Sequence, residues 1–354
     1  MITNAFRATL ADDTPVGLCF EPTLALANHS CNPNAIVVFD GRSVALRELG
    51  AIEKGEQIFI SYITATEDLD SRQHDLKQRY FFDCQCEKCL KDESPYATFL
   101  RYVPKGEGRI DSLCNSKHLV INARNLLASC DDPNDPNVAK ICDHLIMSKF
   151  SADHTAKERL LKQGANECAP EKTLYALHPL PKIMHELYLN YVDTASYVNA
   201  LVLLLFLFLN CDIYNYPEPH HPVRVIRLFT IAKLLKYLSS LSPEEFQSLT
   251  GGTNDGVELR RTIEGINLID SFHAVMILVW EQGSRSHGKE SRFMREVEAE
   301  LRDVEEVQRL RGEVGTRLRN WMGDEGSTEG KKEARRIFEG LRRLSEFVHE
   351  ILTT

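Results

Sequence analysis

The chain has 354 residues, of which 43% are hydrophobic and 26% are charged, as is ordinary for a soluble globular protein. Its formal net charge of −9 argues against a nonspecific nucleic-acid binder, which needs a basic face, and suits basic protein or peptide substrates. Ten cysteines in this length do not indicate a secreted disulfide scaffold, and the N-terminus has no signal-peptide pattern. The most apolar run, ALVLLLFLFL at 200–209, is about half of what a membrane span needs. It predicts a buried helix.

The first 63 residues have the pattern of strands and turns. Apolar segments at 35–39 and 43–49 flank Asp40-Gly41, which predicts a hairpin. A third apolar segment, 57–63, contains Tyr62 near its end. Thr64 and Glu67 then match a capping box, which predicts a short helix that starts at Thr64 and runs to about Tyr80.

From about residue 96 onward the pattern predicts helices alone. Apolar residues recur at helical spacing in 119–127, 139–150, 174–191, 198–209, 223–241, 257–280 and 337–351. Segment 296–319 is highly charged, and we interpret it as a helix with a solvated face. The sequence therefore predicts the α+β class, with parts at 1–63, 64–95 and 96–354. The last part resembles antiparallel helix pairs or a degenerate solenoid.

Three cysteines at Cys84, Cys86 and Cys89 have the spacing C-x-C-x-x-C, which is typical of a metal site. A structural zinc ion prefers four ligands in a tetrahedron, so a fourth ligand has to come from elsewhere. Cys31 is the better candidate, and Cys19 is the weaker one because its surroundings are apolar. Three free cysteines on a loop remain the alternative. A catalytic zinc ion is not expected, because four thiolates leave no open position.

The segment NHSCNPN, at 28–34, admits several interpretations. A Cys/His nucleophile site would need a third, orienting group, and a zinc ligand at Cys31 explains more. His29 alone could be a turn residue that satisfies backbone groups, and Tyr62 alone could be a core tyrosine at a strand end. We expect residues 32–34 to shape the turn. His220-His221 before a proline favours a helix start over a metal site.

Taken together, N-H-S-C-x-P-N, G-E-x-I-x-I-S-Y and C-x-C-x-x-C resemble the second half of a SET domain with its post-SET zinc site. The chain is most similar to the SET and MYND domain (SMYD-like) protein lysine methyltransferases. The resemblance spans roughly residues 1–92, with weaker support to about residue 240. It implies a partial β-rich SET domain with a zinc-bound post-SET segment, followed by an all-α, TPR-like domain. In that family the NHSC cysteine and the three later cysteines share one structural zinc ion, here Cys31, Cys84, Cys86 and Cys89.

The resemblance also implies a function and a set of site residues. The function is S-adenosylmethionine-dependent methylation of lysine in proteins or peptides, histones included, by a protein of the nucleus and cytoplasm. No direct nucleic-acid or membrane partner is expected. The matching positions for the cofactor are Asn4, Asn28, His29, Tyr62 and Phe82, and Tyr62 also matches the tyrosine of the transfer site. Methyl transfer to a neutral amine depends on orientation, which a tyrosine hydroxyl and aromatic walls can supply.

The sequence departs from the family before Asn28. Gly17 is the only glycine there, so the glycine-rich G-x-G cofactor loop does not match, and no MYND zinc finger interrupts the segment. We expect a truncated or naturally shortened form that lacks the N-terminal SET portion and the MYND finger. The alternative function is therefore a non-catalytic, zinc-stabilised scaffold for protein interactions. Methylation of a lysine peptide that responds to Tyr62→Phe would separate the two.

Overall fold

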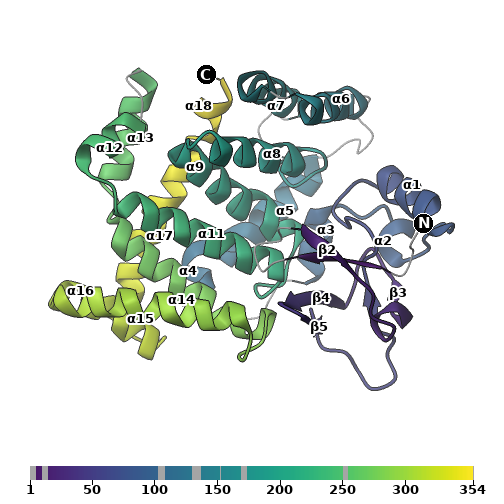
Figure 1. The fold of residues 1–354 in the computed structure, drawn as a ribbon, viewed down its shortest axis with the longest axis horizontal. Coiled ribbons are helices and arrows are strands. Elements are labelled where there is room, and N and C mark those ends of the chain that lie inside the picture. Colours follow the sequence, from purple (N-terminus) through teal and green to yellow (C-terminus); the bar gives the residue numbers. More distant parts are fainter. Residues whose placement is uncertain are drawn as a thin grey trace.

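Strands and helices occupy different ends of the protein in a computed structural model. The structure describes residues 5–9, 15–102, 108–129, 137–151, 153–168, 174–249 and 254–353. All described strands come before residue 61 and lie together at one end, next to two short helices (Figure 1). The rest of the described chain is helical. The predicted α+β class, with a small β region followed by a helical part, is confirmed.

The β region consists of three two-stranded pairs. Strand β1 (Phe6–Thr9) pairs antiparallel with β2 (Pro15–Cys19), and β4 (Ala35–Asp40) pairs antiparallel with β5 (Ser43–Glu48). The β4–β5 pair is the predicted hairpin, and its register joins Asp40 to Ser43 around Gly41, whose φ is 63°. Such a two-residue loop requires positive φ values, which glycine adopts at low cost.

The third predicted strand is much shorter than the apolar pattern indicated. It is β6 (Phe59–Ile60), and it pairs in parallel with β3 (Asn28–His29). Before β6, hydrogen bonds from the Asn34 side chain take the place of main-chain strand pairing. The Asn34 side chain accepts a hydrogen bond from the Phe59 amide at 2.8 Å and donates one to the Gln57 carbonyl at 2.9 Å. Asn34 thus joins the NHSCNPN turn to the start of β6.

Helix α1 (Leu69–Tyr80) ends where the sequence indicated but begins later. The Asp68 carboxylate accepts a 2.8 Å hydrogen bond from the Ser71 amide, so Asp68 caps the helix. The prediction that Thr64 is the N-cap is wrong: the chain forms a turn from Thr64 to Glu67 before the helix starts. An aspartate satisfies the first-turn amides as well as a threonine does, so the pattern alone did not decide between them. Helix α2 (Glu87–Leu90) follows.

The helical part contains the remaining described helices. Their bounds are α3 (Pro95–Arg101), α4 (Asp111–Cys114), α5 (Ser116–Ser129), α6 (Asn137–Phe150), α7 (His154–Cys168), α8 (Leu180–Asp193), α9 (Tyr197–Leu207), α10 (Ile213–Asn215), α11 (Pro222–Ser239), α12 (Pro243–Leu249), α13 (Asn254–Glu264), α14 (Leu268–Ser286), α15 (Arg292–Leu310), α16 (Glu313–Gly323), α17 (Thr328–Glu346) and α18 (Val348–Thr353). Short 3₁₀ turns lie at Leu24–Leu26 and Gly108–Ile110, and a π-helical turn at Phe208–Asp212 continues α9.

One long predicted helix, 257–280, is broken in two. The chain bends by 72° between α13 and α14. Asn267 lies at the bend, and its side chain accepts a 3.0 Å hydrogen bond from the Asp270 amide, so it caps α14. Apolar spacing on both sides of the bend stays helical, which is why the sequence pattern did not reveal the break.

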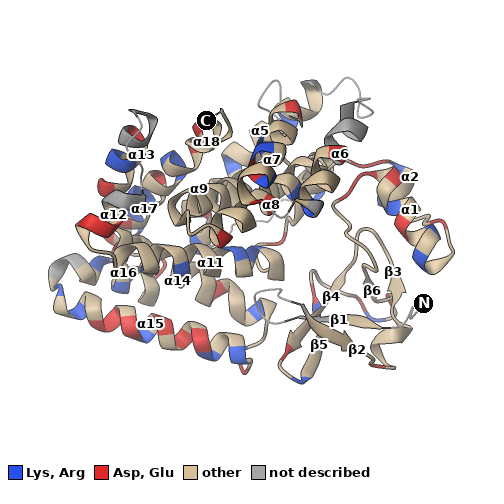
Figure 2. Ribbon diagram, turned by 45° about the horizontal axis from the view of Figure 1, so that its top comes forward, with Lys and Arg blue, Asp and Glu red and all other residues tan. Residues whose placement is uncertain are grey.

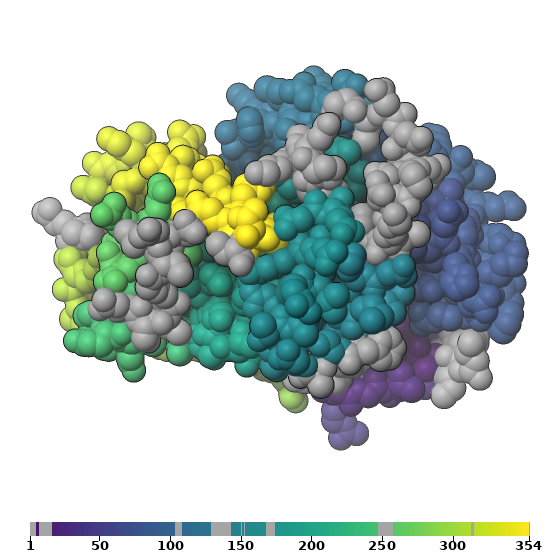
Figure 3. Space-filling view, turned by 90° about the horizontal axis from the view of Figure 1, so that it is seen from above, coloured from purple at the N-terminus to yellow at the C-terminus, as the bar shows by residue number. Residues whose placement is uncertain are grey.

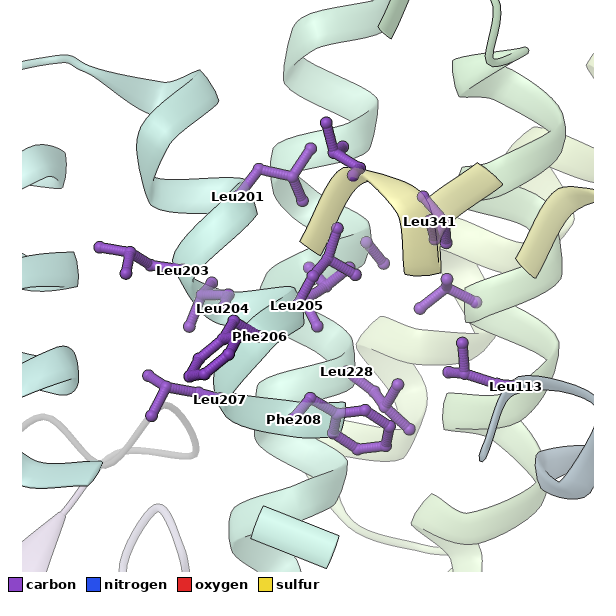
Figure 4. Close-up of a cluster of buried hydrophobic side chains, with 14 of the residues drawn as sticks. Leu113, Leu201, Leu203, Leu204, Leu205, Phe206, Leu207, Phe208, Leu228 and Leu341 are labelled. Carbon is purple, nitrogen blue, oxygen red and sulfur yellow. The ribbon is translucent and has the colours of Figure 1, made fainter. Parts of the chain in front are cut away.

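Helix α9 lies at the centre of the main hydrophobic core. Its leucines and Phe206 are buried on all sides against α8, α11 and α17 (Figure 4). Segment Tyr197–Asn215 is long and apolar enough to cross a membrane, with a mean hydropathy of 1.8, yet 78% of its apolar window is buried inside the fold. The bent pair α13–α14 has a similar composition. The prediction of a buried helix at 200–209 is confirmed.

The charged segment forms helices α15 and α16, and its charges lie on the outer side of the molecule (Figure 2). The opposite face of α15 is buried, with Phe293, Val297 and Leu301 directed inward. The interpretation of a helix with a solvated face is confirmed. Seen from above, the C-terminal helices pack on the segment around residue 200, and the N-terminal region forms the far end (Figure 3).

Candidate functional site

Four cysteines from three segments meet in a small buried cluster. Cys31 follows β3, Cys84 and Cys86 lie between α1 and α2, and Cys89 belongs to α2. Their sulfur atoms all lie within 4.8 Å of one another, and the Cys31 and Cys89 sulfurs are 3.5 Å apart. A zinc ion with four thiolates at about 2.3 Å has sulfur–sulfur edges of about 3.8 Å. The four residues that the sequence assigned to the metal could therefore hold one ion. Cys19 lies on β2 and does not join the cluster.

Two buried cationic side chains flank the cluster. Arg72 is 3% exposed and donates a 3.8 Å hydrogen bond to the Cys89 sulfur, and Lys88 is 8% exposed and donates to the Ala65 carbonyl at 2.6 Å. Buried charges are costly unless opposite charges lie nearby. A zinc ion with four thiolates carries a net charge of −2, which two cations balance. The surroundings of the cysteines thus fit a metal–thiolate centre better than four neutral thiols.

The metal-free thiols also affect one another. The hydrogen bond from Cys31 lowers the pKa of Cys86 to about 3, while burial raises the pKa of Cys84 to about 11. Binding of a metal to all four sulfurs would release the protons that remain, so the affinity should rise with pH.

His29 and Tyr62 contact each other next to the cysteines. The Tyr62 amide donates a 3.0 Å hydrogen bond to Nδ1 of His29, and Nε2 of His29 lies 3.3 Å from the Cys31 sulfur. The Tyr62 hydroxyl donates to the Ala27 carbonyl at 2.5 Å. Burial lowers the pKa of His29 to about 4 and raises the pKa of Tyr62, so both side chains are neutral at pH 7.

Phe82 continues this group of rings. Its ring centroid lies 5.9 Å from that of His29, and the His29 and Tyr62 centroids are 5.3 Å apart. Phe82 and His29 both line a cavity of about 1140 Å³, which is large enough for a cofactor-sized ligand. Tyr62 is not among the lining residues and lies one ring away, beyond His29.

The other two predicted cofactor residues are placed differently. Asn28 is exposed on β3, beside His29, and does not line the cavity. Asn4 lies outside the described residues. The structure therefore brings His29, Tyr62 and Phe82 together with the cysteines, and it leaves Asn28 at the margin of the group.

The far wall of the cavity comes from the helical part and was missed by the sequence reasoning. It contains Glu218, His220, Glu281 and Arg285, while Asp83, Glu87 and Glu56 line the near side. Among the described lining residues, acidic side chains outnumber the one arginine, so this part of the cavity favours cationic ligands. Burial raises the pKa of both Glu218 and Glu281. No local motif marks these positions, because they follow Phe82 by more than 130 residues and line the same cavity only in the folded chain.

The histidine pair at the start of α11 has the predicted role. His221 is the N-cap of α11, and its Nδ1 accepts a 3.2 Å hydrogen bond from the Val223 amide. Pro222 is the first helical residue, a position where its missing amide costs nothing. In the described part of the chain neither histidine belongs to a group of metal-ligating side chains.

Comparisons with known proteins agree with this geometry. The family model of the SET domain matches residues 6–63. The SET domain and MYND-type zinc finger protein 6 of Schizosaccharomyces pombe is 35% identical over 122 residues, which are 34% of this chain and 24% of that protein. The mouse histone-lysine N-methyltransferase SMYD3 is 36% identical over 89 residues, or 25% of this chain and 21% of that protein.

A third relative, the human N-lysine methyltransferase SMYD2, is 31% identical over 121 residues, or 33% of this chain and 28% of that protein. The chain thus matches between a fifth and a third of the length of these relatives. The SET-domain match at residues 6–63 and these relatives together support a SMYD-like SET-domain protein.

Proposed function

We propose that the protein is an S-adenosylmethionine-dependent protein-lysine N-methyltransferase whose cysteine cluster holds one structural zinc ion. The observation that carries the proposal is the contact of His29, Tyr62 and Phe82 beside the four cysteines, at the edge of a large acidic cavity. Two of the three relatives, SMYD3 and SMYD2, are named as lysine methyltransferases, which supports the same reaction class.

The chemistry of the site residues suits methyl transfer. The cofactor supplies a methyl group on a positively charged sulfur, and the acceptor has to be a neutral amine that approaches from the opposite side of the carbon. Phe82 and His29 offer ring faces that exclude water and favour a cation by cation–π attraction. Tyr62 has a neutral hydroxyl that donates its proton to the Ala27 carbonyl. The hydroxyl oxygen can still accept a hydrogen bond from an amine. Orientation, and not acid–base strength, is what these residues contribute.

The acidic lining of the cavity supports a basic protein or peptide as the substrate. Glu218 and Glu281 line the same cavity as Phe82, and Glu281 also pairs with Arg109, so a lysine-containing segment would meet acidic residues on the helical side. Histones are one class of protein with this chemistry. We propose that the protein acts in the nucleus and cytoplasm and has no direct nucleic-acid or membrane partner.

Calorimetry with the zinc-loaded protein tests the proposal. We expect S-adenosylmethionine and its demethylated product to bind with one site per chain, and a lysine-rich peptide to gain methyl groups in the presence of the cofactor. A folded, zinc-loaded sample that binds neither compound would refute the proposal for this chain. Peptide binding without cofactor binding would instead identify the non-catalytic scaffold.

A further inference from the structure

The imidazole of His29 is engaged at both nitrogens by groups from different parts of the site. Its Nδ1 receives the Tyr62 amide at 3.0 Å, and its Nε2 lies 3.3 Å from the Cys31 sulfur. A backbone amide can only donate, so Nδ1 must carry no proton. The proton of the neutral ring therefore lies on Nε2, and Nε2 donates to the sulfur. The Tyr62 amide thus selects the tautomer that points a donor at Cys31.

Tyr62 is attached at both ends to the segment that contains His29. Its amide is bound by the His29 ring, and its hydroxyl is bound by the Ala27 carbonyl at 2.5 Å. The strand pair β3–β6 adds main-chain pairing of His29 with Ile60, and the Ser30 amide donates to the Ile60 carbonyl at 3.0 Å. After Ile60 the strand pairing stops, and side chains bind the main chain of Tyr62: the His29 ring accepts from its amide, and the Tyr80 hydroxyl donates to its carbonyl at 3.3 Å.

We propose that His29 is a positioning residue that connects the metal centre to Tyr62, so that metal binding at Cys31 orders the Tyr62 main chain through the imidazole. The inference rests on the proposed zinc site. Its importance for catalysis rests on the proposed role of Tyr62 in methyl transfer. A metal-bound thiolate is a stronger hydrogen-bond acceptor than a thiol, so the bond from Nε2 tightens when the metal is bound. Tightening this bond fixes the ring, and the fixed ring holds the Tyr62 amide.

Two substitutions separate the two halves of this connection. In His29→Gln the side-chain amide nitrogen falls near the place of Nε2, which keeps a donor for Cys31 and removes the acceptor for Tyr62. In His29→Asn the side-chain oxygen falls near the place of Nδ1, which keeps the acceptor for Tyr62 and removes the donor for Cys31. The matched control is His74→Gln, because His74 is exposed on α1 and lies away from the cluster.

The readouts are the zinc affinity, the spectrum of the cobalt-substituted protein and hydrogen exchange at the Tyr62 amide. None of them requires methyltransferase activity, so failure of this inference and failure of the proposed function are distinguishable. We expect His29→Asn to weaken zinc binding about 10- to 100-fold and to shift the thiolate-to-cobalt band, with the Tyr62 amide still protected in the metal-loaded protein. We expect His29→Gln to keep the zinc affinity within a few fold and to expose the Tyr62 amide to exchange.

A measurement on the unaltered chain keeps the inference testable even if a variant does not fold. Removal of zinc with a chelator should speed exchange at the Tyr62 amide more than at the amides of the β4–β5 hairpin, which has its own pairing. The inference is overturned if metal removal leaves the Tyr62 amide unchanged. It is also overturned if both His29 variants keep both zinc affinity and Tyr62 protection, or if both variants lose both. Either result would mean that the His29 ring acts through packing alone.

Discussion

Arg47 donates a hydrogen bond of 2.9 Å to the backbone carbonyl of His287, although 240 residues separate the two in sequence. This contact joins strand β5 to the turn between α14 and α15. At the start of α15, the Arg292 amide donates a second hydrogen bond, to the Asp40 carboxylate at 2.9 Å. The two bonds attach the β4–β5 hairpin to the helical part and so set the relation between the two walls of the cavity.

A Cβ atom at Gly288, where φ is 93°, would lie 2.0 Å from the Arg47 guanidinium, so a side chain there requires Arg47 to move. We expect Gly288→Ala to displace Arg47, to break its bond to His287 and to destabilise the protein by roughly 2 to 4 kcal/mol. Gly55→Ala is the matched control, since Gly55 also has a φ of 93° but has no atom within 4 Å of the place that a Cβ would take. Thermal unfolding measures the difference. An equal loss of stability in Gly288→Ala and Gly55→Ala would contradict the role of this contact. So would a loss of stability from Gly288→Ala that stays the same when Arg47 is also replaced by alanine.

Cys86→Ser should remove the metal and destabilise the segment around the cluster. We expect about one zinc ion per chain in the unaltered protein and well under half of that in the variant, because a serine hydroxyl is a poor replacement for a thiolate. Elemental analysis of the purified chains gives the metal content, and thermal unfolding gives the stability. Cys19→Ser serves as the control, because Cys19 lies outside the cluster and should keep the metal. Unchanged metal content in Cys86→Ser would refute the assignment.

Tyr62→Phe should abolish methyl transfer and leave the fold intact. The variant loses the bond from the hydroxyl to the Ala27 carbonyl, which costs about 1 kcal/mol of stability, and it loses the polar atom available to the amine. We expect at least a roughly 100-fold lower rate with a lysine peptide and little change in cofactor affinity. The control is Tyr80→Phe, which removes only a 3.3 Å bond to the Tyr62 carbonyl and should keep most of the rate. If the two variants had equal activity, Tyr62 would have no special role.

His273 should make the protein less stable in acid. It is fully buried in α14, and neither ring nitrogen has a hydrogen-bond partner in the described structure. Burial lowers its pKa to about 4; the charge of Asp270 opposes this shift, and that of Arg319 adds to it. Because the unfolded chain binds the proton at a pKa near 6.5, it carries more protons than the folded chain between about pH 6.5 and 4. Stability is therefore fully present above pH 6.5 and falls as the pH drops toward 4, by up to about 3 kcal/mol from this one group.

His273→Met should raise stability at neutral pH, because it replaces an unsatisfied buried ring with an apolar side chain of similar size, and it should flatten the pH dependence. Denaturant unfolding at pH 7 and pH 5 measures both effects. His118→Met is the control, since His118 is exposed on α5. A steeper loss of stability between pH 7 and 5 in the His273 variant would be inconsistent with the buried, neutral ring.

The sequence alone was sufficient for features that depend on short segments. The β4–β5 hairpin followed from two apolar segments around Asp40-Gly41, and the buried helix α9 followed from an apolar run too short for a membrane. The four cysteines could be assembled from spacing and family resemblance, because three of them lie within six residues. In each case the information is local, or it is carried by residue types with few alternative uses.

Only the tertiary structure decided the features that depend on distant partners. The bend at Asn267 and the late start of α1 at Asp68 reflect capping choices that apolar periodicity does not distinguish. The acidic wall of Glu218 and Glu281 exists because α11 and α14 pack side by side, which brings the loop before α11 next to the end of α14, and no local motif encodes this packing. Likewise, the sequence placed His29 and Tyr62 near one cofactor. Folding showed that the His29 ring joins Tyr62 to Cys31, because two hydrogen-bond partners can converge on one imidazole only after the chain has brought them together.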